Sequence, residues 1–322
     1  MSVVLTRSRL SNALKCYVNY ALSLFGLVRS THMPVFVSVE PAAVCQLKCP
    51  ECPVGKGERL KAKGERTMPM EVFRRVLDEV KGTACVMQFY FQGEPLLNKD
   101  LPQMIHETHE TGLYTIVSTN AQAMTQALAE QLVMAGLDRI VVSMDGLTQE
   151  SYGAYRVGGD VEKTKEALKW LREAKIKDRE SKILIELQVL RLKTNEHEWQ
   201  EFKRQYKALG ADRLVFKTAQ LYDYTDGHPL MPSDPRYSRY IQGKDGHYHR
   251  KKLHRGCLRV WSGVVVTTTG EVLPCCYDKG HAYAYGNIMN ASMKELFANE
   301  KATAFRRAAL IEKLSICQEC WK

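Results

Sequence analysis

The chain has 322 residues and a formal net charge of +10, with 45% hydrophobic and 25% charged residues. This is the composition of a soluble globular protein, long enough for one large α/β domain and a smaller one. No apolar run reaches the roughly 18 to 20 residues of a membrane span, and the ten cysteines fit a reducing cytosol better than a disulfide framework. We therefore expect a cytoplasmic protein.

The positive charge is concentrated in two segments. Residues 1–39 carry +4 and no acidic residue, and residues 244–259 carry +5, so these segments supply nine of the ten net charges. An anionic partner near each segment is one interpretation, and a solvated loop is the alternative for the second. No nucleic-acid-binding motif accompanies the charge, so nucleic acid is not an expected partner.

The first predicted element is an amphipathic helix over residues 11–28. Its apolar residues recur at spacings of three and four, and its flanking charges are all basic. They are Leu10, Leu14, Tyr17, Ala21, Phe25 and Val28. Two interpretations stand: this stripe packs on the exterior of the α/β domain, or it lies peripherally on an anionic membrane surface.

Short apolar runs then alternate with helical patterns. The runs predict strands at 35–40, 86–92, 114–120, 139–145, 183–190 and 213–219. The helical patterns cover 70–81, 101–112, 125–136, 163–175 and 196–210. Six βα units with short connections indicate an α/β fold with a parallel sheet, closed or half-closed into a (β/α)6 barrel, and a doubly wound sheet is the alternative.

Three cysteines follow the first predicted strand at the spacing C-x3-C-x2-C. They are Cys45, Cys49 and Cys52 in the segment "CQLKCPECP". A structural zinc site would need a fourth ligand from elsewhere, and zinc cysteines usually come as paired C-x2-C motifs. A cubane iron–sulfur cluster held at three corners is the other interpretation, and it leaves one iron open to bind something else.

Polar residues end the next three strands. The second strand ends in "QGEP" (92–95), the third in "STN" (118–120) and the fourth in "SMDG" (143–146), with Arg156 soon after. Active sites of parallel α/β folds lie at the carboxyl ends of their strands. Ordinary turn chemistry would account for one such end, but three of them beside a cysteine triplet predict a single site.

The triplet after the first strand, with GEP after the second, resembles the radical SAM superfamily over residues 35–220. The resemblance implies that S-adenosylmethionine (SAM) chelates the open iron of a [4Fe-4S] cluster held by Cys45, Cys49 and Cys52. An electron from a reductant such as ferredoxin or flavodoxin then cleaves SAM to a 5′-deoxyadenosyl radical, which removes hydrogen from a substrate.

The resemblance also implies which residues meet SAM. These are Gly93 and Glu94 at its amino group, Ser118 and Asn120 near its ribose with Ser143 beside them, and Arg156 at its carboxylate. One position departs from the family pattern, because Pro50 stands where an aromatic residue usually follows the second cysteine. The packing of adenine must therefore differ locally.

The last third carries a second set of cysteines. Cys257, a "TTTGEVLPCC" segment containing Cys275, and the terminal pair Cys317 and Cys320 resemble the first half of the SPASM pattern, in the shorter form called Twitch. The resemblance implies an auxiliary [4Fe-4S] cluster on these four residues, and a zinc ribbon is the alternative. Cys276 competes with Cys275 for one position.

The predicted domains are an N-terminal helical extension (1–34), a radical SAM core (35–225) and an auxiliary-cluster domain (226–322). The leading function is dehydrogenation of a sugar-like small molecule, with the auxiliary cluster accepting an electron. Alternatives are a radical epimerase with Cys276 as hydrogen donor, a peptide-modifying maturase, and a non-catalytic iron–sulfur or zinc binding protein. The basic residues Arg250, Lys251, Lys252, Arg255 and Arg259 suggest an anionic substrate.

Overall fold

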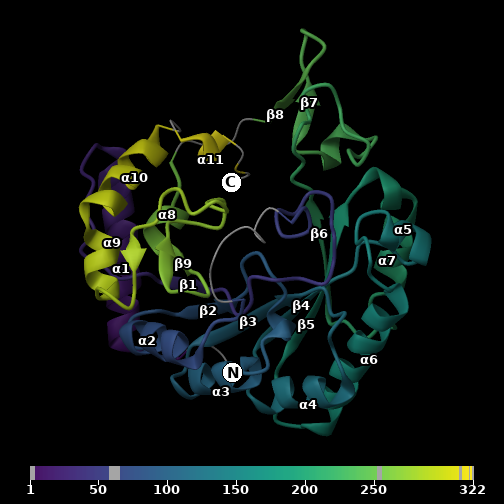
Figure 1. Ribbon diagram of the computed structural model, residues 1–322, viewed down its shortest axis with the longest axis horizontal. Coiled ribbons are helices and arrows are strands. Elements are labelled where there is room, and N and C mark those ends of the chain that lie inside the picture. Colours follow the sequence, from purple (N-terminus) through teal and green to yellow (C-terminus); the bar gives the residue numbers. More distant parts are fainter. Residues whose placement is uncertain (1–3, 58–65, 252–255, 312–313, 319, 321–322) are drawn as a thin grey trace. The chain divides into compact units, whose positions relative to one another are not determined.

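The structure is a computed structural model that describes residues 4–57, 66–251, 256–311, 314–318 and 320 (Figure 1). The chain forms two compact units. The first comprises Met1–Val44, Ala62–Ile116 and Leu253–Lys322, and the second comprises Cys45–Lys61 and Val117–Lys252. This spatial division differs from the sequence-based domain bounds, which stay a prediction.

The first unit is built on a sheet centred on β1 (Phe36–Val39). On one side β1 pairs in parallel with β2 (Val86–Phe89), and on the other with β9 (Gly263–Val266). Strands β10 (Glu271–Leu273) and β11 (Gly286–Asn287) continue the sheet beyond β9 in antiparallel fashion. A segment from the last third of the chain thus lies beside the first strand (Figure 1).

The helices of the first unit come from both ends of the chain and from the segment between its strands. They are α1 (Arg7–Leu24), α2 (Met70–Val80), η2 (Pro95–Leu97), α3 (Leu101–Glu110), α8 (Arg259–Ser262), α9 (Met293–Ala298), α10 (Glu300–Leu310) and α11 (Ser315–Gln318). In α2 the predicted apolar stripe is buried, including Phe73 and Val76. Burial of that stripe fixes which face of α2 meets the protein.

The second unit contains the parallel strands β4 (Arg139–Ser143), β5 (Leu184–Arg191) and β6 (Arg213–Thr218). Strand β3 (Tyr114–Thr119) spans the division between the units. The helices are α4 (Gln126–Met134), α5 (Gln149–Gly153), α6 (Val161–Lys177), η3 (Lys193–Glu198), α7 (Trp199–Gln205) and η4 (Pro235–Tyr237). A hairpin of β7 (Tyr240–Gln242) and β8 (Tyr248–Arg250) follows.

All six predicted strands and the five predicted helices between them are present, each within a few residues of its expected bounds. The last of these helices, predicted at 196–210, begins as the 3-10 helix η3 and continues as α7. No helix among the described residues is both long and apolar enough to cross a membrane. The N-terminal helix is also present, but it begins and ends four residues earlier than expected.

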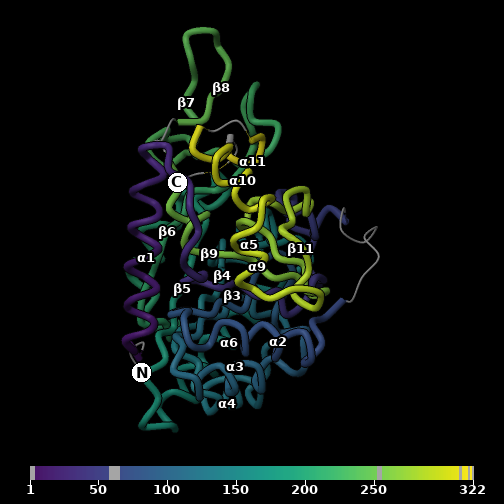
Figure 2. The backbone as a smooth tube through the Cα atoms, turned by 90° about the vertical axis from the view of Figure 1, so that its left-hand side faces the viewer, coloured from purple at the N-terminus to yellow at the C-terminus, as the bar shows by residue number. Residues whose placement is uncertain are grey.

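The expectation that the apolar stripe of this helix packs on the protein is wrong. Leu14 is 64% exposed and Phe25 is 85% exposed, while the buried side is mostly polar. Figure 2 shows α1, in purple, along its length. The reason for this orientation lies in what its polar side chains bind.

Arg9 anchors the helix by its buried guanidinium group. The two Nη atoms donate hydrogen bonds of 2.7–2.8 Å to the carbonyl oxygens of Val4, Lys81, Thr111 and Gly112. Lys81 and Thr111 are the C-caps of α2 and α3. A cation there satisfies terminal carbonyls and complements the negative ends of both helix dipoles. The polar face of α1 is therefore its binding face.

Candidate functional site

The cysteine loop begins at a close contact between two strand ends. The backbone N–H of Glu94 donates to the carbonyl of Val44, directly before Cys45, at 2.8 Å. A Cβ atom on Gly93 would lie 2.0 Å from the carbonyl oxygen of Ala42, so only glycine fits. The "GE" of the second strand end therefore fixes where the cysteine loop starts.

The Cys45 sulfur accepts two hydrogen bonds from nitrogen. Asn120 Nδ2 lies 3.3 Å and the backbone nitrogen of Leu47 lies 3.4 Å from Cys45 Sγ. Gln46 Nε2 holds Asn120 by donating to its Oδ1 at 3.1 Å. Such donors stabilise a thiolate and tune a cluster bound to it. Asn120, which the sequence placed near a ribose, contacts a predicted cluster ligand in the structure.

Cys49 lies beside a buried ion pair. Burial raises the pKa of the Cys49 thiol, and the nearby Arg156 guanidinium opposes that rise. Arg156 Nε donates to Asp145 Oδ2 at 2.6 Å, and the Asp145 side chain is fully buried. Burial disfavours the charge of Arg156, but Asp145, Cys49 and two tyrosines together outweigh that effect, so the pKa of Arg156 is raised. The cation is thus held charged next to Cys49.

Asp145 is itself fixed by the backbone of β5. Its Oδ1 accepts a hydrogen bond of 2.6 Å from the backbone nitrogen of Leu190. Its own carbonyl accepts one of 2.8 Å from Asn195 Nδ2. Sequence reasoning missed Asp145, although it lies in the "SMDG" strand end. Its position three residues before a helix-forming stretch gave no sign that it would be buried.

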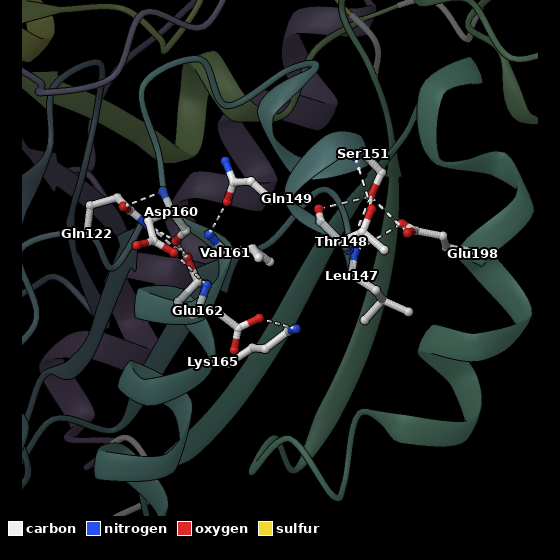
Figure 3. A network of polar contacts seen from close by, with 11 residues as sticks. Gln122, Leu147, Thr148, Gln149, Ser151, Asp160, Val161, Glu162, Lys165 and Glu198 are labelled. Atoms are coloured by element: carbon white, nitrogen blue, oxygen red, sulfur yellow. Dashed lines mark hydrogen bonds and ion pairs between the residues drawn. The ribbon is translucent and has the colours of Figure 1, made fainter.

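A polar network orients the segment 147–165, which carries Arg156 (Figure 3). Glu198 accepts hydrogen bonds from Ser151 Oγ at 2.8 Å and from the backbone nitrogen of Leu147 at 3.0 Å. Thr148 caps α5 in a capping box with Ser151. Gln122 bonds to both the backbone nitrogen and the carbonyl of Asp160. These bonds fix both ends of the segment around Arg156.

The remainder of the cysteine loop is a tight turn. The backbone nitrogen of Cys52 donates to the Cys49 carbonyl at 3.2 Å. Glu51 accepts a hydrogen bond of 2.6 Å from the backbone nitrogen of Tyr222 and lies 3.5 Å from His228 Nε2. Glu51 therefore ties the loop to the segment after β6. It was not singled out from the sequence, because a lone glutamate between two cysteines carries no motif.

Three other predicted SAM contacts lie at strand ends. Glu94 is buried, and its Oε1 accepts a hydrogen bond from the backbone nitrogen of Leu96, which caps η2. Ser143 is buried at the end of β4, and Ser118 is half-buried in β3. Gly93 and Glu94 belong to the first unit, whereas Ser118, Asn120, Ser143 and Arg156 belong to the second. Their contacts with SAM stay predictions.

The structure brings the cysteines of the last third together within the first unit. Cys257 precedes α8, Cys275 and Cys276 follow β10, and Cys317 lies in α11. Burial raises the pKa of Cys275, and the thiols of Cys276, Cys257 and Cys317 raise it further. Burial also raises the pKa of Cys320, with Cys257 and Cys276 adding to the effect. All five thiols therefore share one neighbourhood.

A cavity of about 380 Å³ borders two of these cysteines, Cys275 and Cys276. Its wall includes Ser38 of β1, Gln88 and Tyr90 at β2, and Arg259, Cys275 and Cys276. Arg259 Nη1 donates to Cys276 Sγ at 3.0 Å, and the negative charge of Cys276 raises the pKa of Arg259. The volume is that of a small-molecule pocket.

The basic residues that precede and follow Cys257 have different roles. Arg259 lines the cavity, whereas Lys251 Nζ donates to the carbonyl oxygens of Pro235 and Ser238 and so supports the hairpin. Lys252 and Arg255 lie outside the described residues. Among the described members of the predicted anion-binding set, Arg259 lines the cavity.

The arrangement of the thiols bears on which metal group they suit. No three Cys, His, Asp or Glu side chains within the described ranges converge as ligands of one metal ion would. A tetrahedral zinc draws four sulfurs to about 2.3 Å from a single ion. In a cubane each thiolate binds a different iron, so the sulfurs stand further apart. The N–H donors of Asn120 and Leu47 aimed at the Cys45 sulfur are of the kind that tunes an iron–sulfur cluster.

Comparison with known proteins agrees with this chemistry. The family profile described as the radical SAM superfamily matches residues 39–204. The chain belongs to the radical SAM superfamily. A second profile, SPASM, described as an iron–sulfur cluster-binding domain, matches residues 257–321. The protein is therefore a radical SAM enzyme, and a non-catalytic binding protein is no longer a competing interpretation.

Curated relatives are distant and differ in activity. The chain is 27% identical over 262 residues to a PqqA peptide cyclase of Granulibacter bethesdensis, covering 75% of this chain and 67% of the relative. It is 25% identical to the AdoMet-dependent heme synthase of Methanosarcina barkeri, covering 89% of this chain and 88% of the relative. These names do not agree on one substrate.

Solved structures share the fold at lower identity. BtrN in complex with AdoMet and 2-DOIA matches with a TM-score of 0.54 and 18% identity, covering 90% of this chain and 94% of BtrN. Streptococcus suis SuiB bound to S-adenosylmethionine matches with a TM-score of 0.67 and 15% identity, covering 97% and 76%. The fold is α/β, a partial (β/α)6 TIM-type barrel with a small C-terminal iron–sulfur domain. The cofactors of this radical SAM enzyme are SAM and [4Fe-4S] clusters.

Proposed function

We propose that this enzyme oxidises an unactivated C–H bond of a substrate held in the cavity beside Cys275 and Cys276. The observation that carries the proposal is the cavity itself, because its wall is shared by core strands β1 and β2 and by the auxiliary cysteines. When bound, the two clusters and SAM supply hydrogen-atom abstraction and an electron acceptor. The substrate loses two hydrogens in all: one as an atom, the other as a proton and an electron.

The proposed ligands follow the two thiol clusters. Cys45, Cys49 and Cys52 hold the SAM-binding cluster, and Cys257, Cys275, Cys317 and Cys320 hold the auxiliary one. Asn120 and the Leu47 backbone support the Cys45 thiolate, and Arg156 supports that of Cys49. Gly93, Glu94, Ser118, Ser143 and Arg156 receive SAM. A one-electron reductant such as ferredoxin or flavodoxin completes the system.

The contact between Arg259 and Cys276 favours oxidation over epimerisation. A radical epimerase needs a thiol that gives a hydrogen atom to the substrate. In the structure Arg259 Nη1 donates to the Cys276 sulfur at 3.0 Å, so this sulfur contacts a cationic side chain. A radical epimerase with Cys276 as hydrogen donor is therefore the second candidate function. The contact of the charged Arg259 side chain with Cys276 is the observation against it.

The cavity also supports a substrate class. About 380 Å³ holds a small molecule or a short stretch of a larger one. Arg259 is a cation with further N–H donors, which suits a phosphate or carboxylate group. A small anionic molecule is the leading substrate. A peptide is the alternative, because a relative is named a PqqA peptide cyclase and SuiB has been solved bound to the precursor peptide SuiA.

The test is anaerobic reconstitution with iron, sulfide, SAM and dithionite, followed by incubation with a cell extract in heavy water. The proposal predicts a small-molecule product lighter by two hydrogen atoms, formed together with 5′-deoxyadenosine. A product of unchanged composition that carries one deuterium would establish epimerisation instead. A peptide that loses two hydrogens would keep the oxidation and change the substrate class.

A further inference from the structure

We propose that the N-terminal helix α1 docks this enzyme flat on an anionic phospholipid membrane, with the apolar side of the helix in contact with the lipid. The inference does not depend on the proposed reaction. It rests on an amphipathic helix whose polar face is turned toward the protein and whose apolar face is turned toward solvent.

The inward face is polar and makes several hydrogen bonds with the protein. Besides Arg9, Asn12 Nδ2 donates to the carbonyl oxygens of Met33 and Thr83 at 3.0 and 3.1 Å. Asn12 Oδ1 accepts from the backbone nitrogen of Met33 at 2.8 Å. If the helix turned over, these buried groups would face solvent or apolar side chains and their partners would lose their bonds. These hydrogen bonds of the polar face therefore fix the outward direction of the apolar face.

A second polar contact fixes the C-terminal half of the helix. Asn19 Nδ2 lies 2.9 Å from His32 Nδ1, and His32 Nε2 lies 2.8 Å from the carbonyl oxygen of Trp261. Tyr20 packs edge-on against the Trp261 ring, with centroids 5.6 Å apart. The helix is thus held along its length, and its free face is a fixed surface.

The outward face carries apolar side chains along the length of the helix, beside the exposed polar residues Arg7, Ser8, Ser11 and Lys15. The large apolar residues exposed there are Leu10, Leu14, Tyr17, Val18 and Leu24, and Phe25 directly after the helix. At 1.5 Å per residue the 18-residue helix is about 27 Å long. Val4 and Leu5 before the helix and Leu27 after it are also exposed, so the apolar surface continues past both ends. Isolated exposed apolar residues are ordinary, but a series of them along a whole helix indicates a binding face.

Charge identifies the membrane as the occupant. Residues 1–39 contain no acidic residue, while Arg7, Lys15 and Arg29 are exposed at and between the ends of the apolar face. Apolar contact combined with basic residues is what binds an amphipathic helix to anionic lipid. Tyr17 adds an aromatic ring with a polar tip, which favours the headgroup region. A protein partner of ordinary composition would not require a surface with only one sign of charge.

The experiment is co-sedimentation of the full-length, cluster-containing protein with vesicles of phosphatidylcholine alone or mixed with phosphatidylglycerol. The test variant is Leu14→Ser with Phe25→Ser, two exposed positions where folding does not depend on the side chain. The matched control is Met134→Ser with Ile176→Ser, which removes equally exposed apolar side chains from α4 and α6. A third variant, Arg7→Gln with Lys15→Gln, removes charge alone.

The proposal predicts binding to the mixed vesicles and a loss of about tenfold or more in apparent partitioning for the test variant. The control should bind like the wild type, and the charge variant should lose binding and salt sensitivity together. Equal sedimentation of the test variant and control would overturn the proposal. A wild-type chain that does not bind vesicles but forms a dimer, where the test variant stays a monomer, would also overturn it. In that case a second copy of the chain would cover the helix. SAM cleavage should be unchanged throughout, which separates this test from that of the reaction.

Discussion

Replacing Asp145 with Asn should strip the buried Arg156 cation of its counter-charge. The carboxylate is fully buried and lies 2.6 Å from Arg156 Nε, whose side chain is 15% exposed. An asparagine still accepts the hydrogen bond from the Leu190 backbone through its oxygen, but it carries no charge. Breaking one partner of a buried ion pair costs about 3 to 5 kcal/mol. We expect Asp145→Asn to lower the free energy of unfolding by that amount.

The same change should disturb the cysteine loop, because Arg156 also opposes the rise in the Cys49 pKa. The assay is urea unfolding of the cluster-free chain, followed by iron content after reconstitution. The matched control is the double variant Asp145→Asn with Arg156→Met, which removes both charges and should regain much of the lost stability. A loss below about 1 kcal/mol for the single variant, or a double variant as unstable as the sum of the single ones, would refute the buried-pair reasoning.

Three further predictions concern other contacts. Gly93→Ala should prevent the cysteine loop from closing, because the new Cβ meets the Ala42 carbonyl oxygen at 2.0 Å. Cluster loading, measured by iron content, should therefore fall. The control Gly82→Ala, whose Cβ would lie in open space, should leave the iron content unchanged. Burial, opposed by the bond to the Trp261 carbonyl, lowers the pKa of His32 to about 4. Between about pH 6.5 and 4 the unfolded chain therefore binds a proton at His32 that the folded chain does not bind. The free energy of unfolding should fall by about 2 kcal/mol from pH 7 to pH 5. In urea unfolding, His32→Gln should flatten that pH dependence. Arg9→Met should cost about 3 kcal/mol or more by leaving terminal carbonyls of α2 and α3 unsatisfied, and an unchanged thermal midpoint would contradict the anchoring role.

The sequence predicted the repeating part of the fold because buried parallel strands and amphipathic helices each have their own apolar period. Strands β1 to β6 and helices such as α2 follow those periods directly. The parallel pairing of β9 with β1 was not predicted, since the Val264–Val266 run lies far from β1 in sequence and nothing local records its partner. Long-range pairing is set by tertiary packing, which propensity does not encode.

The functional site, like the fold, could be predicted only in part from the sequence. Cysteine spacing identified the two thiol clusters, because metal binding imposes a pattern on the sequence. Asp145 and Glu51 support the cysteine loop through contacts to distant backbone groups, and such contacts leave no pattern. For α1 the predicted period was right, and of the two interpretations the one that packs the apolar stripe on the protein was wrong. The pattern shows that one side is apolar, but only Arg9 finding the ends of α2 and α3 decides which side the protein uses.

The most direct test of the account is the metal and product analysis of a variant in which Cys45, Cys49 and Cys52 are all replaced by Ala. The account predicts about eight irons per chain in the reconstituted wild type and about four in the variant, since each cubane carries four. It also predicts that dithionite and SAM yield 5′-deoxyadenosine only with the wild type. A variant that still produces 5′-deoxyadenosine, or one in which zinc replaces the four remaining irons, would contradict it.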